Sequence, residues 1–205
     1  GVGENGKSFG IIADNTWKME ISTGEKITFS SEGPSFRLII IEKDNPKEVI
    51  QELVNITGKI ELPPLWSLGF HQCRYSYYPE KRVKSIVDTM RLKQIPCDVI
   101  WMDIDYMQDF KIFSFDSIGF PNPKKTNDYL HSKKFKSVWM IDPGVKKENG
   151  YFVYDSGDEI DAWVKDSNDS TFVGKVWPGD CVFPDFTQST VCDWWGGLYG
   201  EFMST

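Results

Sequence analysis

Three groups of polar side chains, each directly after an apolar run, are the residues of this sequence best suited to do chemistry. Arg74 and Tyr75 follow the first run. Asp103 and Asp105 follow the second run, and Asp142 follows the third. If the runs are neighbouring parallel strands, these side chains meet at the rim where α/β barrels carry their sites. Carboxylates are costly to bury unless they are paired, so the pattern indicates either a binding site or a structural ion pair.

Two interpretations of the acidic residues are open at this point. In the first, one of Asp103 and Asp105 points into a site, while the other orients a loop or pairs with Arg74. In the second, the acidic residues at the strand ends cap the helices that follow, and they have no part in binding.

A loop further along the chain supplies aromatic side chains. Trp177 lies between glycines and a proline in the segment 174–179, and the segment 183–186 reads Phe-Pro-Asp-Phe. A pyranose stacks its C–H face on an aromatic ring while its hydroxyls bond to charged groups, so this mixture is typical of a sugar site. Core packing is the preferred explanation for three other tryptophans, Trp66, Trp194 and Trp195.

The elements that must position these residues follow a β-rich start. Strands are predicted over residues 9–13, 18–22, 25–30 and 36–41. A helix is predicted from Asn45-Pro46, which supplies a capping side chain and a proline in the first turn, to Gly58. The Pro63-Pro64 pair then forces an extended segment. We therefore expect two domains, residues 1–60 and 61–205.

The second domain alternates strands and helices. Apolar runs predict strands over 66–70, 98–105 and 136–142, and helical periodicity predicts helices over 83–90, 127–134 and 191–202. A long loop rich in glycine and proline separates the last strand from the last helix. This order predicts an α/β fold with parallel strands and crossover helices.

Composition and short motifs argue against several classes of protein. The 205 residues carry 23 basic and 30 acidic side chains, a net charge of −7, which does not suit a nucleic-acid binder. No apolar run approaches the roughly 18–20 residues of a membrane helix. Four cysteines without a C-x-x-C pair, and two histidines, do not support a metal site. We expect no cofactor, and neither the compartment nor the oligomeric state is indicated.

Five motifs occur in a characteristic order. They are GFHQCRY at 69–75, WMDIDYM at 101–107, MIDPGV at 140–145, VWPG at 176–179 and FPDFT at 183–187. Together they resemble glycoside hydrolase family 31, the retaining α-glucosidases. The segments 98–101 and 155–157 are similar to those of the plant heteroglycan glucosidase branch. The resemblance implies the first three strands of a (β/α)8 TIM barrel, preceded by the end of an N-terminal β-sandwich.

The resemblance also implies the residues that bind an α-glucoside or α-glucan substrate. Asp103 aligns with the group that holds sugar hydroxyls. Tyr75 stands where the family usually has Trp, and Gln108 stands where it usually has Asp, so both positions bear on sugar preference. The implied substrate-binding set is Asp103, Ile104, Tyr75, Met140, Asp142 and Trp177, with Arg74 and Asp105 in support.

No catalytic residue is expected within these 205 residues. A retaining glycosidase uses two carboxylates about 5–5.5 Å apart, and the family's W-x-D-M-N-E-P type nucleophile motif is missing from the sequence. We expect the chain to supply substrate-binding groups to a hydrolase whose catalytic pair lies downstream. The alternatives are a truncated, non-catalytic carbohydrate-binding or regulatory paralogue and an α/β protein that does not bind carbohydrate. The α-xylosidases and α-glucan lyases of the family share the same scaffold.

The 205-residue chain by itself should not hydrolyse α-glucosides, because it holds neither member of that carboxylate pair. An assay of the purified chain with a chromogenic α-glucoside measures this directly. Turnover at a rate typical of the family would refute the expectation.

Overall fold

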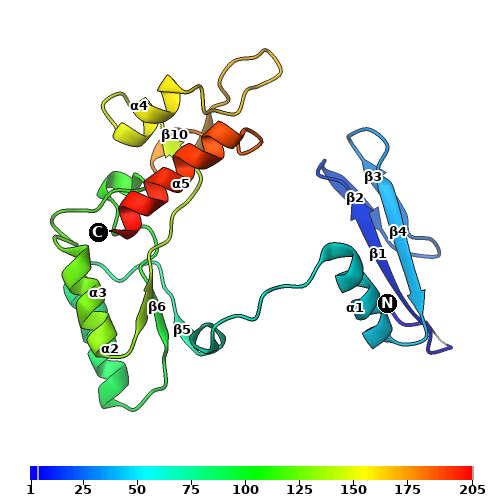
Figure 1. The fold of residues 1–205 in the computed structure, drawn as a ribbon, viewed down its shortest axis with the longest axis horizontal. Coiled ribbons are helices and arrows are strands. Elements are labelled where there is room, and N and C mark those ends of the chain that lie inside the picture. Colours follow the sequence, from blue (N-terminus) through cyan, green and yellow to red (C-terminus); the bar gives the residue numbers. More distant parts are fainter. Residues whose placement is uncertain (4, 205) are drawn as a thin grey trace. The chain divides into compact units, whose positions relative to one another are not determined.

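The computed structural model describes residues 1–3 and 5–204 (Figure 1). The chain divides into two compact units, Gly1–Leu62 and Pro63–Thr205. None of the helices in the described part of the chain is long and apolar enough to cross a membrane. All four cysteines are free thiols, with Cys97 and Cys181 buried and Cys73 and Cys192 exposed.

The first unit contains two antiparallel strand pairs and one helix. The pairs are β1 (Ser8–Asp14) with β4 (Arg37–Lys43), and β2 (Met19–Ser22) with β3 (Thr28–Ser31). Helix α1 (Pro46–Thr57) packs against the first pair, where the side chain of Val49 lies close to Gly10.

The two ends of α1 are those that the sequence predicts. The side chain of Asn45 accepts a hydrogen bond from the backbone N–H of Glu48 (3.1 Å), which satisfies one free donor of the first turn. Gly58 ends the helix at φ 87°, and its N–H bonds to the carbonyl of Val54. This left-handed conformation favours glycine, since other residues place a Cβ too close to the backbone there.

The second unit is built on a parallel sheet of order β5-β6-β7. The strands are β5 (His71–Gln72), β6 (Val99–Trp101) and β7 (Lys136–Val138), joined by α2 (Glu80–Leu92) and α3 (Pro123–Ser132). Fully buried side chains from α2, α3 and the central strand form one core, made by Val83, Val87, Ile100 and Leu130. The predicted α/β alternation with parallel strands is confirmed.

Three strands predicted for the second unit differ in the structure, and the one predicted over 98–105 is limited to Val99–Trp101. The run 66–70 is not a strand: Leu65–Leu68 forms a 3₁₀ turn, and the strand begins at His71. The turn follows Pro64, whose carbonyl accepts the N–H of Ser67 (2.9 Å). The strand predicted over 136–142 ends at Val138, because the next residues make side-chain contacts in place of ladder bonds.

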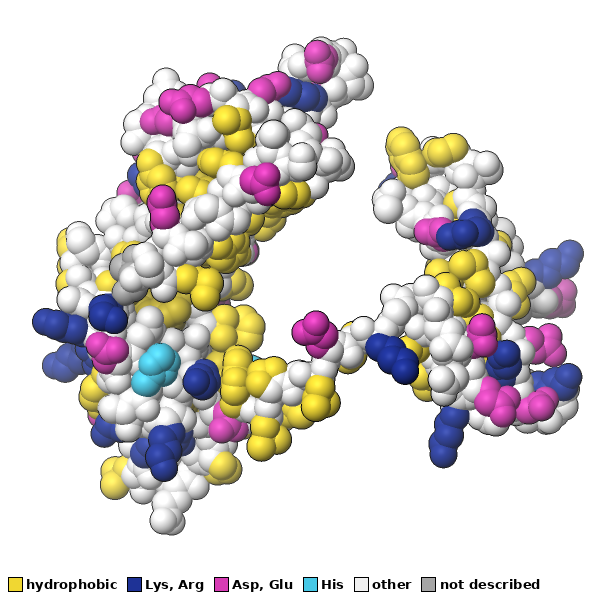
Figure 2. All heavy atoms as spheres, viewed as in Figure 1, with side chains coloured by type: hydrophobic (Ala, Val, Ile, Leu, Met, Phe, Trp, Pro, Cys, Tyr) yellow, Lys and Arg dark blue, Asp and Glu magenta, His cyan; other side chains and the backbone are white. Residues whose placement is uncertain are grey.

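The predicted long loop contains regular structure. It holds β8 (Val145–Lys146), α4 (Phe152–Glu159), β9 (Gly174–Val176) and β10 (Gly179–Val182), and the strands form an antiparallel sheet of order β8-β10-β9. These strands are too short and too rich in glycine to show a period of two. Helix α5 (Ser189–Met203) follows, as predicted, and Figure 2 shows hydrophobic side chains around it on the visible face.

Arg91 ties the end of α2 to two other elements. Its guanidinium donates to the carbonyls of Lys133 (2.8 Å) and Lys134 (3.2 Å), just after α3, and to that of Cys97 (2.8 Å), just before β6. The guanidinium also lies 3.9 Å from the ring centroid of Phe135. This arrangement needs a guanidinium, because its planar group carries several N–H donors and can also stack on a ring.

Replacing Arg91 by Lys should lower the free energy of unfolding by about 1–3 kcal/mol, because an ammonium group cannot serve all these carbonyls or stack as well on the ring. Urea denaturation measures the change. Arg82→Lys, at an exposed position of the same helix, is the matched control and should stay within about 0.5 kcal/mol of wild type. Equal stability of the two variants would contradict the role of Arg91.

Candidate functional site

Alternation along β6 decides which side chains face the helices. Ile100 lies in the core formed with α2 and α3. Its ladder partner Ser137 donates from Oγ to Oδ1 of Asn127 on α3 (2.7 Å), so this row of the sheet faces the helices. Since successive side chains point to opposite faces, Val99 and Trp101 face the other way.

The side chains on the face away from the helices come just before the polar residues that follow the strands. His71 pairs with Val99, and Val138 pairs with Trp101, so all four share this face. The indole Nε1–H of Trp101 donates to Nδ1 of His71 (3.2 Å), which links the first two strands on that side. Met140 follows Val138 by two residues in the chain.

The loops after β5 and β6 bring two carboxylates beside two side chains of the first loop. The chain leaves the strand before Asp103, which has φ 49°. Asp105 accepts a hydrogen bond from Ser76 and raises the pKa of the exposed Tyr75. Partial burial raises the pKa of the Cys73 thiol, and the charge of Asp103 raises it further. The two loops therefore meet at Ser76 and Asp105, and Tyr75 lies within electrostatic range of both carboxylates.

Two predicted site residues have other surroundings. Arg74 is exposed and forms no ion pair within the part of the chain that the structure describes, so the pairing with Asp105 that was one expectation is not observed. Asp105 is bonded to Ser76 instead and so holds the loop after β5. Ile104 is 4% exposed and packs in the hydrophobic core of the unit.

Tyr106 joins the loop after β6 to the segment after β7. Its ring is fully buried, and its hydroxyl donates to the carbonyl of Met140 (2.6 Å). Burial raises the pKa of Tyr106 far above its ordinary value, and the charges of Tyr199 and Asp142 add to the effect. The hydroxyl therefore stays protonated and the bond persists. Met140 and Asp142 are half-buried beside it.

Trp177 occupies the tight turn between β9 and β10 and is 69% exposed. The turn is anchored next to Asp142, because a Cβ added at Gly144 would lie only 2.7 Å from Cγ2 of Val176. The structure thus connects Trp177 to the segment after β7, and its ring is free to meet a ligand.

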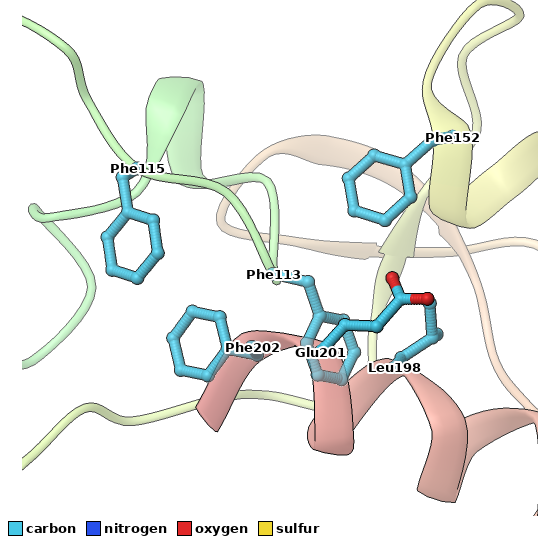
Figure 3. Close-up of a pocket in the computed structure, with 6 residues that line it drawn as sticks. All are labelled: Phe113, Phe115, Phe152, Leu198, Glu201 and Phe202. Atoms are coloured by element: carbon cyan, nitrogen blue, oxygen red, sulfur yellow. The ribbon is translucent and has the colours of Figure 1, made fainter. Parts of the chain in front are cut away.

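Two of the hollows among the described residues of this unit differ in character. One, of about 200 Å³, is apolar: Figure 3 shows four phenylalanine rings and Leu198 around it, with Glu201 extending from α5 among them. The other, of about 370 Å³, adjoins Asp105 and mixes aromatic and acidic side chains. Within the described residues, no group of three or more His, Cys, Asp or Glu is arranged to hold a metal ion.

Ser76 and Tyr106 organise these loops, and the sequence alone did not predict a role for either residue. Tyr106 stands directly after the Asp103–Asp105 pair, and an aromatic residue at that place could have marked it. Ser76 carries no signal of its own, because its bond to Asp105 joins loops that are far apart in the sequence.

Comparison with protein families and known proteins gives consistent results. The model described as the glycosyl hydrolases family 31 TIM-barrel domain matches residues 60–205. The chain is 40% identical to "Alpha-glucosidase 2" of Bacillus thermoamyloliquefaciens, over 94% of this chain and 25% of that protein. It is 33% identical to "Probable glucan 1,3-alpha-glucosidase" of Arabidopsis thaliana, over 75% of this chain and 17% of that protein.

A solved structure gives a similar picture. The family 31 alpha-glucosidase from Bacteroides thetaiotaomicron superimposes with a TM-score of 0.88 at 52% identity, covering 98% of this chain and 34% of that one. Both bacterial proteins are more similar to this chain than the plant protein is. The chain spans a quarter to a third of the length of the two bacterial proteins.

Replacing Tyr106 by Phe should lower the free energy of unfolding by about 1–2 kcal/mol, since it leaves the Met140 carbonyl without its partner. Thermal or urea unfolding measures the change. Tyr199→Phe, on the partly exposed face of α5, is the control and should change stability less. If Tyr106→Phe is as stable as wild type, the hydroxyl does not hold these two segments together.

Proposed function

The chain belongs to glycoside hydrolase family 31, and we propose that it forms the first part of the (β/α)8 barrel of a retaining α-glucosidase. In this proposal β5, β6 and β7 are the first three barrel strands, within residues 61–205. Residues 1–60 are the end of an N-terminal β-sandwich and a linking helix. The parallel order β5-β6-β7 and the family match over residues 60–205 support this assignment.

The proposed role of these residues is to grip the terminal glucosyl unit of an α-glucoside or α-glucan. The observation that carries it is the meeting of the loops after β5 and β6, where Ser76 donates a hydrogen bond to Asp105 and Tyr75 lies within electrostatic range of both carboxylates. Carboxylate oxygens accept hydrogen bonds from sugar hydroxyls, while an aromatic ring covers the apolar face of the pyranose. Asp103 takes the hydroxyls, and Asp105 keeps the loop with Tyr75 in place.

The remaining wall comes from the segments after β7. Met140 supplies an apolar surface whose backbone is fixed by Tyr106, and Asp142 adds a second acceptor. Trp177 supplies a stacking surface from the β9–β10 turn. Ile104 supports the wall from behind, and Arg74 lies at its exposed margin.

Hydrogen bonds to the sugar hydroxyls assist catalysis when they strengthen as the oxocarbenium-like transition state forms. The groups described here position the ring and exclude water from one side of it. The nucleophile and the acid/base are two further carboxylates, which a longer protein carrying this chain would provide. No metal ion takes part in such a hydrolysis.

In the full-length enzyme, Asp103→Asn should lower kcat/KM for an α-glucoside by roughly 10- to 100-fold, because a charged acceptor is replaced by a neutral one. Steady-state kinetics with a chromogenic α-glucoside measure the effect. Asp128→Asn, at an exposed position on α3, is the matched control.

If Asp103→Asn has the same kinetics as wild type, Asp103 does not bind the substrate. A full-length protein that binds glucose or maltose but hydrolyses no α-glucoside would instead favour the non-catalytic carbohydrate-binding alternative.

A further inference from the structure

Two contacts join the loop after β6 to the segment that follows β8. Lys111, in that loop, donates a hydrogen bond from Nζ to Oε1 of Glu148 (3.0 Å). The carbonyl of the next residue, Ile112, accepts a hydrogen bond from the hydroxyl of Tyr151 (2.6 Å). The partners are 37 and 39 residues apart in the sequence, so both contacts tie together segments that the chain does not itself hold side by side.

The side chain of Lys111 is shielded from water and its backbone is fixed. The side chain is 17% exposed, and Nζ lies 5.8 Å from the ring centroid of the buried Tyr151. The N–H of Lys111 donates to the carbonyl of Gln108 (2.9 Å), and its own carbonyl accepts a hydrogen bond from the hydroxyl of Ser114. A charge that is fixed and shielded in this way makes a stronger and better directed ion pair than two mobile surface charges do.

Glu148 has two cationic partners. One carboxylate oxygen accepts the hydrogen bond from Lys111, and the other lies 2.7 Å from Nζ of Lys146 in β8. The bonds from Lys146 and Lys111 lower the pKa of Glu148, so its carboxylate is ionised at neutral pH. The pair with Lys146 stays within one segment, whereas the pair with Lys111 crosses to the loop after β6.

The segment that carries Glu148 is continuous with the sheet that carries Trp177. Strand β8 pairs with β10, and just after β8 the N–H of Lys147 donates to the carbonyl of Asp180 (2.9 Å). Strand β10 pairs in turn with β9, and Trp177 lies in the turn between these two strands. Backbone hydrogen bonds therefore connect the position of Glu148 to that of the turn.

We propose that Lys111 and Glu148 are positioning residues for substrate binding, because they hold the sheet β8-β10-β9, and with it Trp177, against the loop after β6. The inference rests on the proposed function, in which Trp177 stacks on the sugar and Asp103, at the start of that loop, accepts its hydroxyl groups. The ion pair then sets how the aromatic part of the site is placed relative to the acidic part, without contact between the pair and the sugar.

Glu148→Gln removes the charge of the pair and keeps the shape of the side chain. In the full-length enzyme, KM for a chromogenic α-glucoside should rise about three- to tenfold while kcat changes less than about twofold, because a displaced stacking surface weakens substrate and transition state alike. Lys111→Met should have the same effect, and Lys111→Arg, which keeps the charge, should stay near wild type. Glu159→Gln, at an exposed position at the end of α4, is the matched control.

A double-mutant cycle shows whether the pair acts through Trp177. In a Trp177→Ala background, Glu148→Gln should raise KM further by less than about twofold, since the surface that Glu148 positions is gone. If the effects of the two substitutions on KM simply multiply, Glu148 acts elsewhere and the proposal is overturned. It is also overturned if Glu148→Gln and Lys111→Met leave KM unchanged, or lower kcat alone.

Hydrogen exchange of the full-length protein without ligand separates this proposal from the proposed function. The amides of residues 174–182 should exchange faster in Glu148→Gln than in wild type, while those of β5, β6 and β7 should not. Faster exchange together with weaker glucose binding, in a protein that hydrolyses no α-glucoside, would keep the positioning role and reject the hydrolase. An active enzyme in which the substitution changes neither exchange nor KM would reject the positioning role and keep the hydrolase.

Discussion

The central position of β6 in the parallel sheet constrains what the rest of the second unit presents to a ligand. Ile100 must face α2 and α3 to complete the core, and strand alternation then sends Trp101 to the opposite face. A shift of one residue in the register would exchange the two faces and turn Ile100 away from the helices. The carboxylates that follow the strand reach the rim because this pairing fixes where the strand ends. Loops far apart in the sequence meet there, and the hydrogen bond from Ser76 to Asp105 is one result.

Much of the fold is predictable because local chemistry and tertiary structure agree. The capping residue Asn45 and the left-handed Gly58 mark α1 at both ends, and apolar periodicity marks α2 and α5. The strand predicted over 66–70 shows where agreement fails. A run of apolar residues does not distinguish a strand from a 3₁₀ turn, and here the bond from Ser67 to the carbonyl of Pro64 decides in favour of the turn. The sheet β8-β10-β9 escapes prediction for a related reason, since its strands are shorter than the window in which alternation is visible.

Prediction of the site follows the same division. Residue type and position after an apolar run point to Asp103 and Asp142, because this information is local. The surroundings of a side chain are not local. Nothing near Asp105 in the sequence indicates Ser76, and nothing near Lys111 indicates Glu148. The core position of Ile104 likewise depends on how the loop folds back, which a linear pattern does not contain.

The turn that carries Trp177 has a consequence for how this scaffold diversifies. Its two strands, β9 and β10, are paired by backbone hydrogen bonds, and Val176 packs close to Gly144. Neither contact involves the parallel ladder. Insertions or exchanges at the tip therefore leave the register of the parallel sheet unchanged, since no ladder bond of β5, β6 or β7 passes through it. Exposed residues of this turn, Trp177 among them, can therefore be exchanged at little cost to folding.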